Sequence, residues 1–310
     1  MKFGLHLIQQ NIEMPELRKL WRWADTAGFD WIDVSDHFIE SPQTEKRGGY
    51  LECLACLAAL ACDTEHARLG QLVLGMNYRH PAVLAKALSA IDHLSEGRLE
   101  IGLGAGWHEE EYRGYGIPFA GIGKRLDVLE EGIQVIRMLM TMPEATFQGE
   151  YFQLDAATCD PKPLQANPRI WVGGNGEKRT LRIAARHSDG WNSPYTSPEE
   201  VARLGGVLDE WCEREGRDPA AIERNVNLSF HLAPTEADRP RAEVHFVDAW
   251  GERASFVRGK GIILGTPDEA IDQVGRYERA GMARVLIAVR PPLDWEALEA
   301  WTAEVIPAFN

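Results

Sequence analysis

The regular alternation of short strand-like runs with longer helix-like runs is the feature that most constrains the fold of this 310-residue chain. Short runs rich in aliphatic and β-branched residues predict strands, and most of the segments between them carry apolar residues at helical spacing. Strands that alternate with helices in this way form a parallel sheet, and about eight of them can close into a barrel. The expected strands are 2–8, 30–35, 68–75, 98–105, 169–174, 189–192, 226–233 and 283–289.

The helices expected between these strands have recognisable ends. Pro81 opens one helix, at the position where proline is favoured, and Gly28 closes another at a position suited to glycine. We therefore predict an α/β fold of the (β/α)8 TIM barrel type, with an open doubly wound sheet as the alternative. The expected helices are 14–28, 50–62, 81–95, 124–141, 177–187, 198–215, 267–280 and 294–306.

Two connections are longer than the usual loop. Barrels of this kind commonly span about 250 residues or more as one unit, so residues 1–310 are expected to form a single domain. Its regular pattern is interrupted by insertions around 142–168 and 234–265. The first contains a hairpin-like stretch at 146–154, and we expect the second to be irregular. Long loops in barrels often act as lids or binding walls, although they can also be surface padding.

The charge and the cysteines exclude several classes of protein. A net charge of −14 repels nucleic acid, and no apolar run approaches the ~20 residues that cross a membrane. The odd count of five cysteines and the absence of a secretory signal favour the cytoplasm. Cys53 and Cys56 form a C-x-x-C, but both lie on one apolar helical face, which indicates small buried side chains rather than a redox or metal site.

The reacting groups of a (β/α)8 barrel come from the C-terminal ends of its strands. Asp36 and His37 follow the second strand, and a carboxylate beside an imidazole can fix its tautomer and hold it ready to exchange a proton. The alternative is that Asp36 caps the next segment and His37 merely packs. Other polar, aromatic or glycine residues expected at strand ends are His6, Gln9, Ser35, Gly75, Met76, Asn77, Tyr78, Trp107, His108, Glu109, Trp191, Asn192 and His231.

Two strand ends run into glycine-rich turns. Gly102, Gly104 and Gly106 form the first, and the second consists of Gly173, Gly174, Asn175 and Gly176. Glycine lets the backbone approach an anion, and the second turn opens a helix whose N-terminus favours negative charge. The chain is acidic overall, so a phosphate site needs local positive charge, which Lys178, Arg179, Arg182 and Arg186 can supply. The alternative is that both are merely tight turns.

Other chemistries have little support. His6, Asp36, His37, His80, His108 and Glu109 could supply metal ligands, yet no H-E-x-x-H or H-x-H spacing is present, so no metal site is expected. A serine nucleophile is also not expected, because the chain has no G-x-S-x-G elbow.

At these residues the chain resembles the luciferase-like monooxygenase superfamily, and more closely its branch of coenzyme F420-dependent oxidoreductases. The similarity covers most of the chain except 193–264. The segments that carry it are FGLHL at the start, GFDWIDVSDHF (28–38), RLGQLVLGMNYRHPAVLAK (68–86), LSEGRLEIGLGAGWHEEEYRGYGIPF (94–119), RLDVLEEGIQVIRML (125–139), IWVGGNGEKRTLRIAARHSDGWN (170–192) and GTPDEAI (265–271).

The resemblance implies a homodimeric barrel that holds F420 or FMN at its mouth. Asp36 and His37 would lie at the tricyclic ring, against a bulge at a non-prolyl cis peptide between Leu72 and Val73. Gly75 and Asn77, after this bulge, are further candidate contacts. The residues expected to face the cofactor's tail and phosphate are Gly106, Trp107, Gly173, Gly174, Asn175 and Gly176. Trp107 stands where related sugar-phosphate dehydrogenases carry a glutamate, which puts that proton donor and that substrate in doubt.

The expected reaction is hydride transfer between C5 of F420 and an unidentified small organic substrate. His37 or Glu109 would handle the accompanying proton, and Asp36 would orient His37. The alternatives are an FMN-dependent monooxygenase that uses reduced flavin and O2, a non-catalytic F420- or flavin-binding protein, and a hydrolase that uses Asp36 and His37. An apolar, aromatic substrate pocket is suggested by Tyr78, Trp107, Tyr112, Trp191 and Tyr195.

Overall fold

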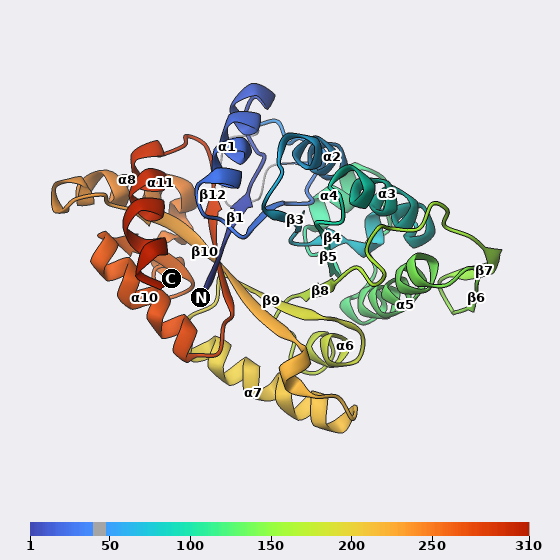
Figure 1. The fold of residues 1–310 in the computed structure, drawn as a ribbon. Coiled ribbons are helices and arrows are strands. Elements are labelled where there is room, and N and C mark those ends of the chain that lie inside the picture. The colour runs from blue at the N-terminus through green and yellow to red at the C-terminus, as the bar shows by residue number, and fades with distance from the viewer. Residues whose placement is uncertain (40–47, 310) are drawn as a thin grey trace.

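The computed structural model describes residues 1–39 and 48–309, and within them a parallel sheet closes into a barrel (Figure 1). β1 pairs with β2 and β12, and β9 pairs with β8 and β10, so the sheet has no open side. The (β/α)8 prediction is confirmed, and the open-sheet alternative is wrong. The barrel strands are β1 (Lys2–Leu7), β2 (Trp31–Val34), β3 (Arg68–Gln71) with β4 (Leu74–Gly75), β5 (Leu99–Gly104), β8 (Ile170–Gly173), β9 (Gly190–Pro194), β10 (Glu223–Leu232) and β12 (Arg284–Val289).

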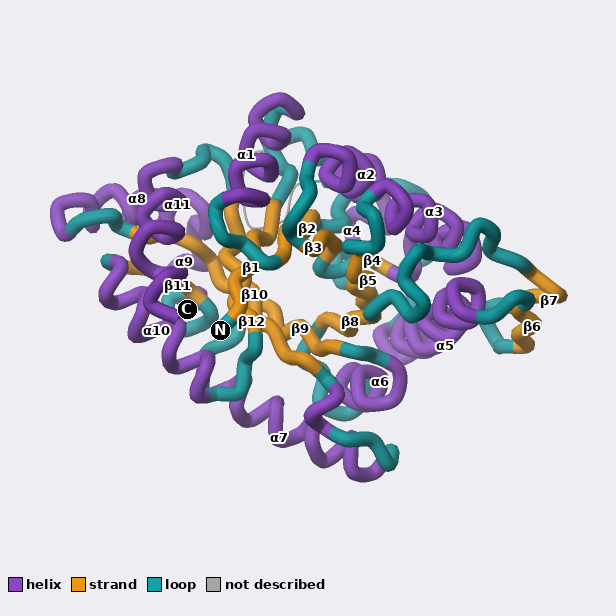
Figure 2. Tube along the Cα trace, in the orientation of Figure 1, coloured by secondary structure: helices purple, strands orange, loops and turns teal. Residues whose placement is uncertain are grey.

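Helices surround the strands, as Figure 2 shows. Each helix buries one apolar face against the barrel, as helix α2 does with Cys53, Cys56 and Leu60, which confirms the prediction that the two cysteines pack as small apolar groups. None of the described helices has the length and apolar character needed to cross a membrane. The outer helices are α1 (Met14–Thr26), α2 (Cys53–Asp63), α3 (Pro81–Leu94), α5 (Ile122–Thr141), α6 (Thr180–His187), α7 (Pro198–Arg214), α10 (Pro267–Arg279) and α11 (Trp295–Ala300).

The third strand is interrupted where a continuous strand 68–75 was predicted. β3 and β4 are separated by a cis peptide bond between Leu72 and Val73, the position that the resemblance implied. β4 then continues alongside β5, with Leu74 opposite Leu103. The interruption places Leu72 and Val73 at the barrel mouth.

The first long connection contains the expected hairpin. β6 (Ala145–Gln148) and β7 (Gln153–Ala157) pair in antiparallel fashion and project beyond α5 (Figure 1). The carboxylate of Glu131, on α5, accepts hydrogen bonds from the backbone N–H groups of Glu150, Tyr151 and Phe152, which tie the hairpin turn to the helix.

The second long connection is more regular than predicted. Within 234–265 lie α8 (Arg239–Trp250), α9 (Ala254–Val257) and β11 (Ile262–Gly265), which extends the sheet by pairing with Ser229 to Leu232 of β10. The expectation of an irregular segment is therefore wrong. Helix α8 buries only Ala242, Phe246 and Trp250, one residue per turn among charged neighbours, and so narrow a stripe is easily overlooked in the sequence.

Large side chains fill the interior of the barrel near the N-terminal ends of its strands. The Arg284 guanidinium lies 4.6 Å from the centre of the Trp31 ring, and the indole N–H of Trp171 donates to Glu100 at 2.6 Å. All four residues are buried. This packing closes the N-terminal end of the barrel, so the open space lies at the C-terminal ends of the strands.

Candidate active site

A cavity of about 570 Å³ opens at the C-terminal ends of the barrel strands. This volume falls within the ~300–1,000 Å³ that is typical of small-molecule and cofactor sites. Its walls come from both halves of the chain, so strand ends far apart in the sequence converge as predicted. The residues that line the cavity include Asp36, His37, Leu72, Val73, Gly75, Tyr78, Gly104, Gly106, Trp107, Gly173, Gly174, Asn192, Tyr195, Asn227, Arg253 and Arg290.

Asp36 has a different partner from the one expected. Its carboxylate accepts two hydrogen bonds from the guanidinium of Arg79, both at 2.8 Å, and a third from the backbone N–H of Gly75 at 2.9 Å. The expectation that Asp36 orients His37 is therefore wrong. Asp36 instead joins the segment after β2 to Gly75 of β4 and to Arg79 beyond it, and so positions Gly75 in the cavity wall.

The carboxylate that contacts His37 is that of Glu111, on the short helix α4 (Glu109–Gly114). Its Oε2 lies 2.9 Å from Nδ1 of His37 and accepts from the Tyr78 hydroxyl at 2.6 Å, while Oε1 accepts from the backbone N–H of Phe38 at 2.6 Å. Burial raises the pKa of the Glu111 carboxyl, but these hydrogen bonds outweigh burial and leave the pKa below its ordinary value. An ionised Glu111 accepts a hydrogen bond from the Nδ1–H group of a neutral His37 ring, which leaves Nε2 of that ring as a hydrogen-bond acceptor.

Glu109 does not reach the cavity. Its side chain is 55% exposed and pairs with Arg113 at 2.8 Å, whereas the Glu111 side chain is fully buried. Residues that are two positions apart on a helix have side chains on nearly opposite faces. The expectation that Glu109 stands at the reacting centre is therefore wrong, and the glutamate of α4 that contacts His37 is Glu111. The signal for Glu111 in the sequence is its spacing of three residues from His108, which puts both on one helical face.

Val73 and two glycines shape the wall between β4, β5 and β8. A Cβ added at Gly104 would lie 2.5 Å from Cγ2 of Val73, and one added at Gly173 would lie 2.6 Å from Cγ1. Gly106 and Gly174 have φ angles of +72° and +123°, which favour glycine. The glycines of both turns therefore make room for Val73 and for sharp turns at the cavity.

We expect Gly173→Ala to lower the free energy of unfolding by about 1–3 kcal/mol, because branched Val73 has little freedom to rotate away from the new methyl group. Urea denaturation measures the change. Gly114→Ala is the matched control: among the described residues no atom lies within 4 Å of the added Cβ, so the variant should be neutral or slightly stabilising. Equal stability of the two variants would contradict this account of the wall.

The predicted cluster of positive charge on α6 lies outside the cavity. Arg182 and Arg186 each approach Glu130 of α5 at 2.9 Å, and Arg179 pairs with Asp127 at 2.5 Å. A hydrogen bond with His187, together with these arginines, lowers the pKa of Glu130 to about 2 despite partial burial. The three arginines therefore bind α6 to α5, and neither they nor Lys178 are among the lining residues of the cavity; their role in a phosphate site stays a prediction.

Two other arginines line the cavity instead. Arg253 comes from the second long connection, and Arg290 directly follows β12, with its guanidinium 5.1 Å from the centre of the Trp250 ring. Sequence reasoning missed both. Arg290 could have been found by its place just after a predicted strand, whereas nothing in the pattern around Arg253 marks it.

Several predicted contacts lie just behind the cavity wall. The Asn77 side chain donates to the carbonyl oxygen of Ala105 at 3.1 Å, and Asn175 donates to the Thr196 hydroxyl at 2.8 Å. Asn77, Asn175 and Gly176 are not among the lining residues, so their expected direct contact with a ligand is not supported. The asparagines tie neighbouring loops together.

The aromatic residues divide into two groups. Trp107 lines the cavity, is 54% exposed, and lies with its ring centre 5.5 Å from that of His37. Tyr78 and Tyr195 also line the cavity, whereas Tyr112 and Trp191 are fully buried and do not line it. Three of the five aromatic residues suggested for a substrate pocket therefore line the cavity, the suggestion is wrong for Tyr112 and Trp191, and the use of the cavity by a substrate stays a prediction.

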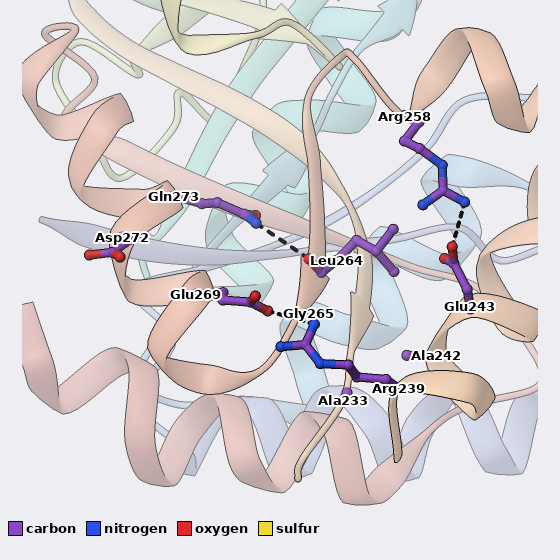
Figure 3. A pocket seen from close by; sticks show the side chains of 10 residues that line it. All are labelled: Ala233, Arg239, Ala242, Glu243, Arg258, Leu264, Gly265, Glu269, Asp272 and Gln273. Carbon is purple, nitrogen blue, oxygen red and sulfur yellow. Dashed lines mark hydrogen bonds and ion pairs between the residues drawn. The ribbon is translucent and has the colours of Figure 1, made fainter. Parts of the chain in front are cut away.

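A second pocket, of about 500 Å³, lies between α8, β11 and α10 and is drawn in Figure 3. Arg239 pairs with Glu269 at 2.9 Å and Arg258 with Glu243 at 2.6 Å, so its cations are already neutralised. None of the strand-end candidates lines it. The barrel mouth is therefore the better candidate for an active site.

Known proteins resemble this chain over most of its length. An uncharacterized protein of Mycobacterium tuberculosis is 34% identical over 236 residues, 75% of this chain and 76% of that protein. An F420-dependent glucose-6-phosphate dehydrogenase of Intrasporangium calvum is 28% identical over 319 residues, 93% and 92% of the two chains. A solved F420-dependent secondary alcohol dehydrogenase, in complex with an F420–acetone adduct, has the same fold, with a TM-score of 0.86 and 21% identity over 100% of this chain and 99% of that one.

The luciferase-like monooxygenase profile matches residues 1–261. This match confirms the resemblance seen in the sequence: the chain belongs to the luciferase-like monooxygenase family.

Proposed function

We propose that this protein is an F420-dependent oxidoreductase that transfers a hydride between C5 of the deazaflavin and a small organic substrate. The observation that carries the proposal is the placement of His37 in the cavity wall with Nδ1 held by Glu111. The relatives named as F420-dependent enzymes support the choice of cofactor.

The cavity fits a large, partly apolar ring system. Leu72 and Val73 offer an apolar wall, while Asn192 and Asn227 offer amide groups and Arg253 offers a positive charge. Here Leu72, Val73, Gly75, Gly173 and Gly174 would contact the cofactor through apolar side chains or bare backbone. Arg253 and Arg290, rather than the arginines of α6, would face its negative charges.

A bound deazaflavin supplies a carbon that accepts or returns a hydride. When an alcohol is oxidised in this way, the substrate loses a hydride from carbon and a proton from oxygen. His37 Nε2 accepts that proton, because Glu111 holds the proton of the neutral ring on Nδ1. Trp107 covers one side of His37 and limits the access of water to it. The same residues work in reverse when a carbonyl or an activated double bond is reduced.

Two alternative functions can be distinguished from this proposal by experiment. An FMN-dependent monooxygenase would use the same barrel, since a long-chain alkane monooxygenase shares the fold with a TM-score of 0.84 at 15% identity. A non-catalytic carrier would bind F420 without passing hydride. Neither rival explains the buried Glu111 behind His37 as directly as proton transfer does.

The decisive test is a titration of the purified protein with F420 and, separately, with FMN, followed by fluorescence. We expect F420 to bind in the micromolar range or tighter and FMN at least tenfold more weakly. Gly173→Ala should weaken F420 binding, whereas Gly114→Ala should not. Tight binding of FMN without binding of F420 would overturn the proposal.

Stopped-flow mixing then separates enzyme from carrier. Protein loaded with reduced F420 is mixed with a panel of enones, imines and ketones. Protein loaded with oxidised F420 is mixed with alcohols. We expect at least one compound class to change the F420 absorbance, while bound cofactor that never exchanges hydride would favour the carrier. The homodimeric state and the cytoplasmic location stay predictions, which gel filtration with light scattering and cell fractionation can check.

A further inference from the structure

Three potential metal ligands meet beside the cavity. His37 follows β2, and His108 and Glu111 lie at the start of α4, so the residues come from two elements. One ligand atom from each residue lies within 4.8 Å of the other two. His108 and Glu111 were brought near each other by helical spacing, but only the barrel brings His37 to them.

His108 is the independent sign that something is missing at this point. The residue is 3% exposed, and neither of its ring nitrogens has a hydrogen-bond partner among the residues that the structure describes. Buried polar groups in folded proteins nearly always have a partner, so an unpaired imidazole indicates a ligand. Its Nδ1 lies 3.4 Å from Oε2 of Glu111 but makes no hydrogen bond with it.

The donor set and spacing suit a divalent transition-metal ion. Zinc binds imidazole nitrogen and carboxylate oxygen at ~2.0–2.2 Å, so tetrahedral ligands lie about 3.3 Å from one another. Oε2 of Glu111 lies 2.9 Å from Nδ1 of His37 and 3.4 Å from Nδ1 of His108, close to that spacing. Two nitrogens and one oxygen disfavour Mg²⁺ and Ca²⁺, which prefer oxygen ligands.

We propose that His37, His108 and Glu111 bind a divalent transition-metal ion such as Zn²⁺, and that the bound ion inhibits proton transfer by His37. Coordination by Nδ1 displaces the proton that this nitrogen shares with Glu111. The neutral ring then carries its proton on Nε2, so Nε2 can no longer accept one from a substrate. Oε1 of Glu111 keeps its hydrogen bonds from Phe38 and Ile39.

Metal binding is tested on the protein without cofactor, by isothermal titration calorimetry with ZnCl2 and with MgCl2. Exposed Cys62 is first replaced by Ser, because a thiol could bind zinc by itself. We expect one Zn²⁺ per chain at micromolar affinity and no Mg²⁺. In that background His108→Gln should weaken Zn²⁺ binding at least tenfold, while His66→Gln, at an exposed histidine before β3, should not.

A spectrum of the Cys62→Ser protein provides a measurement that does not depend on replacing any proposed ligand. Co²⁺ bound by two imidazoles and a carboxylate should show visible d–d bands without a thiolate charge-transfer band. Equal Zn²⁺ affinity in His108→Gln and the parent, or a sulfur band with Co²⁺, would overturn the site.

The inhibition rests on the proposed function, whereas the binding does not. The rate of F420 reduction is measured with a substrate that F420 oxidises. A small molar excess of Zn²⁺ over protein should reduce this rate at least fivefold in the parent and less than twofold in His108→Gln, each relative to its own metal-free rate. Zinc binding without this difference would overturn the inhibitory role. Failure of F420 to bind would overturn the proposed function and leave the zinc titration interpretable.

Discussion

Replacing Arg79 with Met is expected to lower the free energy of unfolding by about 3–5 kcal/mol, measured by urea denaturation at neutral pH. The Asp36 side chain is fully buried, and Arg79 gives it two hydrogen bonds at 2.8 Å. Removing the guanidinium leaves a buried carboxylate with the Gly75 N–H as its remaining hydrogen-bond donor in the described structure. Breaking a buried ion pair from one side has a cost of this size.

Two controls separate this pair from ordinary surface charge. Arg113→Met removes an arginine whose side chain is 76% exposed in its pair with Glu109, and it should change stability by no more than about 0.5 kcal/mol. The double variant Asp36→Asn with Arg79→Met should recover part of the loss, because no buried charge remains. A destabilisation by Arg79→Met no larger than that by Arg113→Met would show that the pair does not hold the β2 and β4 ends together.

Replacing Glu111 with Gln is expected to reduce kcat/KM by about 10²–10⁴, the usual contribution of a positioned proton-transfer group. In the proposed mechanism Glu111 acts through His37, so it is a positioning residue. A neutral amide no longer fixes the proton on Nδ1, and the pH profile of kcat/KM should therefore change in shape as well as height. A uniform loss with an unchanged profile would indicate a merely structural role.

Glu109→Gln is the matched control on the same short helix. Its side chain is exposed and pairs with Arg113, so kcat/KM should stay within about twofold of the parent. The reverse pattern, with Glu109→Gln inactive and Glu111→Gln active, would restore the assignment that the sequence favoured.

The stability of Glu111→Gln, compared with that of the parent, is expected to depend on pH. The pKa of Glu111 is lower in the folded protein than its ordinary value of 4.5, so its ionised form stabilises the fold above about pH 4.5. That contribution is lost as the pH falls through the folded-state pKa. The difference in unfolding free energy between the parent and Glu111→Gln should therefore be largest near neutral pH and shrink below pH 4.5.

Much of the site follows from strand ends, and the errors share one cause. His37 and Gly106 were expected at the barrel mouth because each follows a predicted strand, Gly173 because it lies at the end of one, and Val73 because of the family resemblance; all four line the cavity. The partners of these residues were less predictable. Neighbours in sequence suggested that Asp36 serves His37, yet adjacent residues on an extended segment point in different directions. Arg79 and Glu111 lie far along the chain from the residues they contact.

Local pattern alone determined the barrel, the positions of its eight strands and of most helices between them, and the family, because periodicity and turn glycines act over a few residues. The tertiary structure alone decided which of three successive glutamates is buried, which arginines face the cavity, and that His108 meets His37. Those outcomes depend on charges from distant elements meeting in a common low-dielectric space, where geometry and desolvation select the partner.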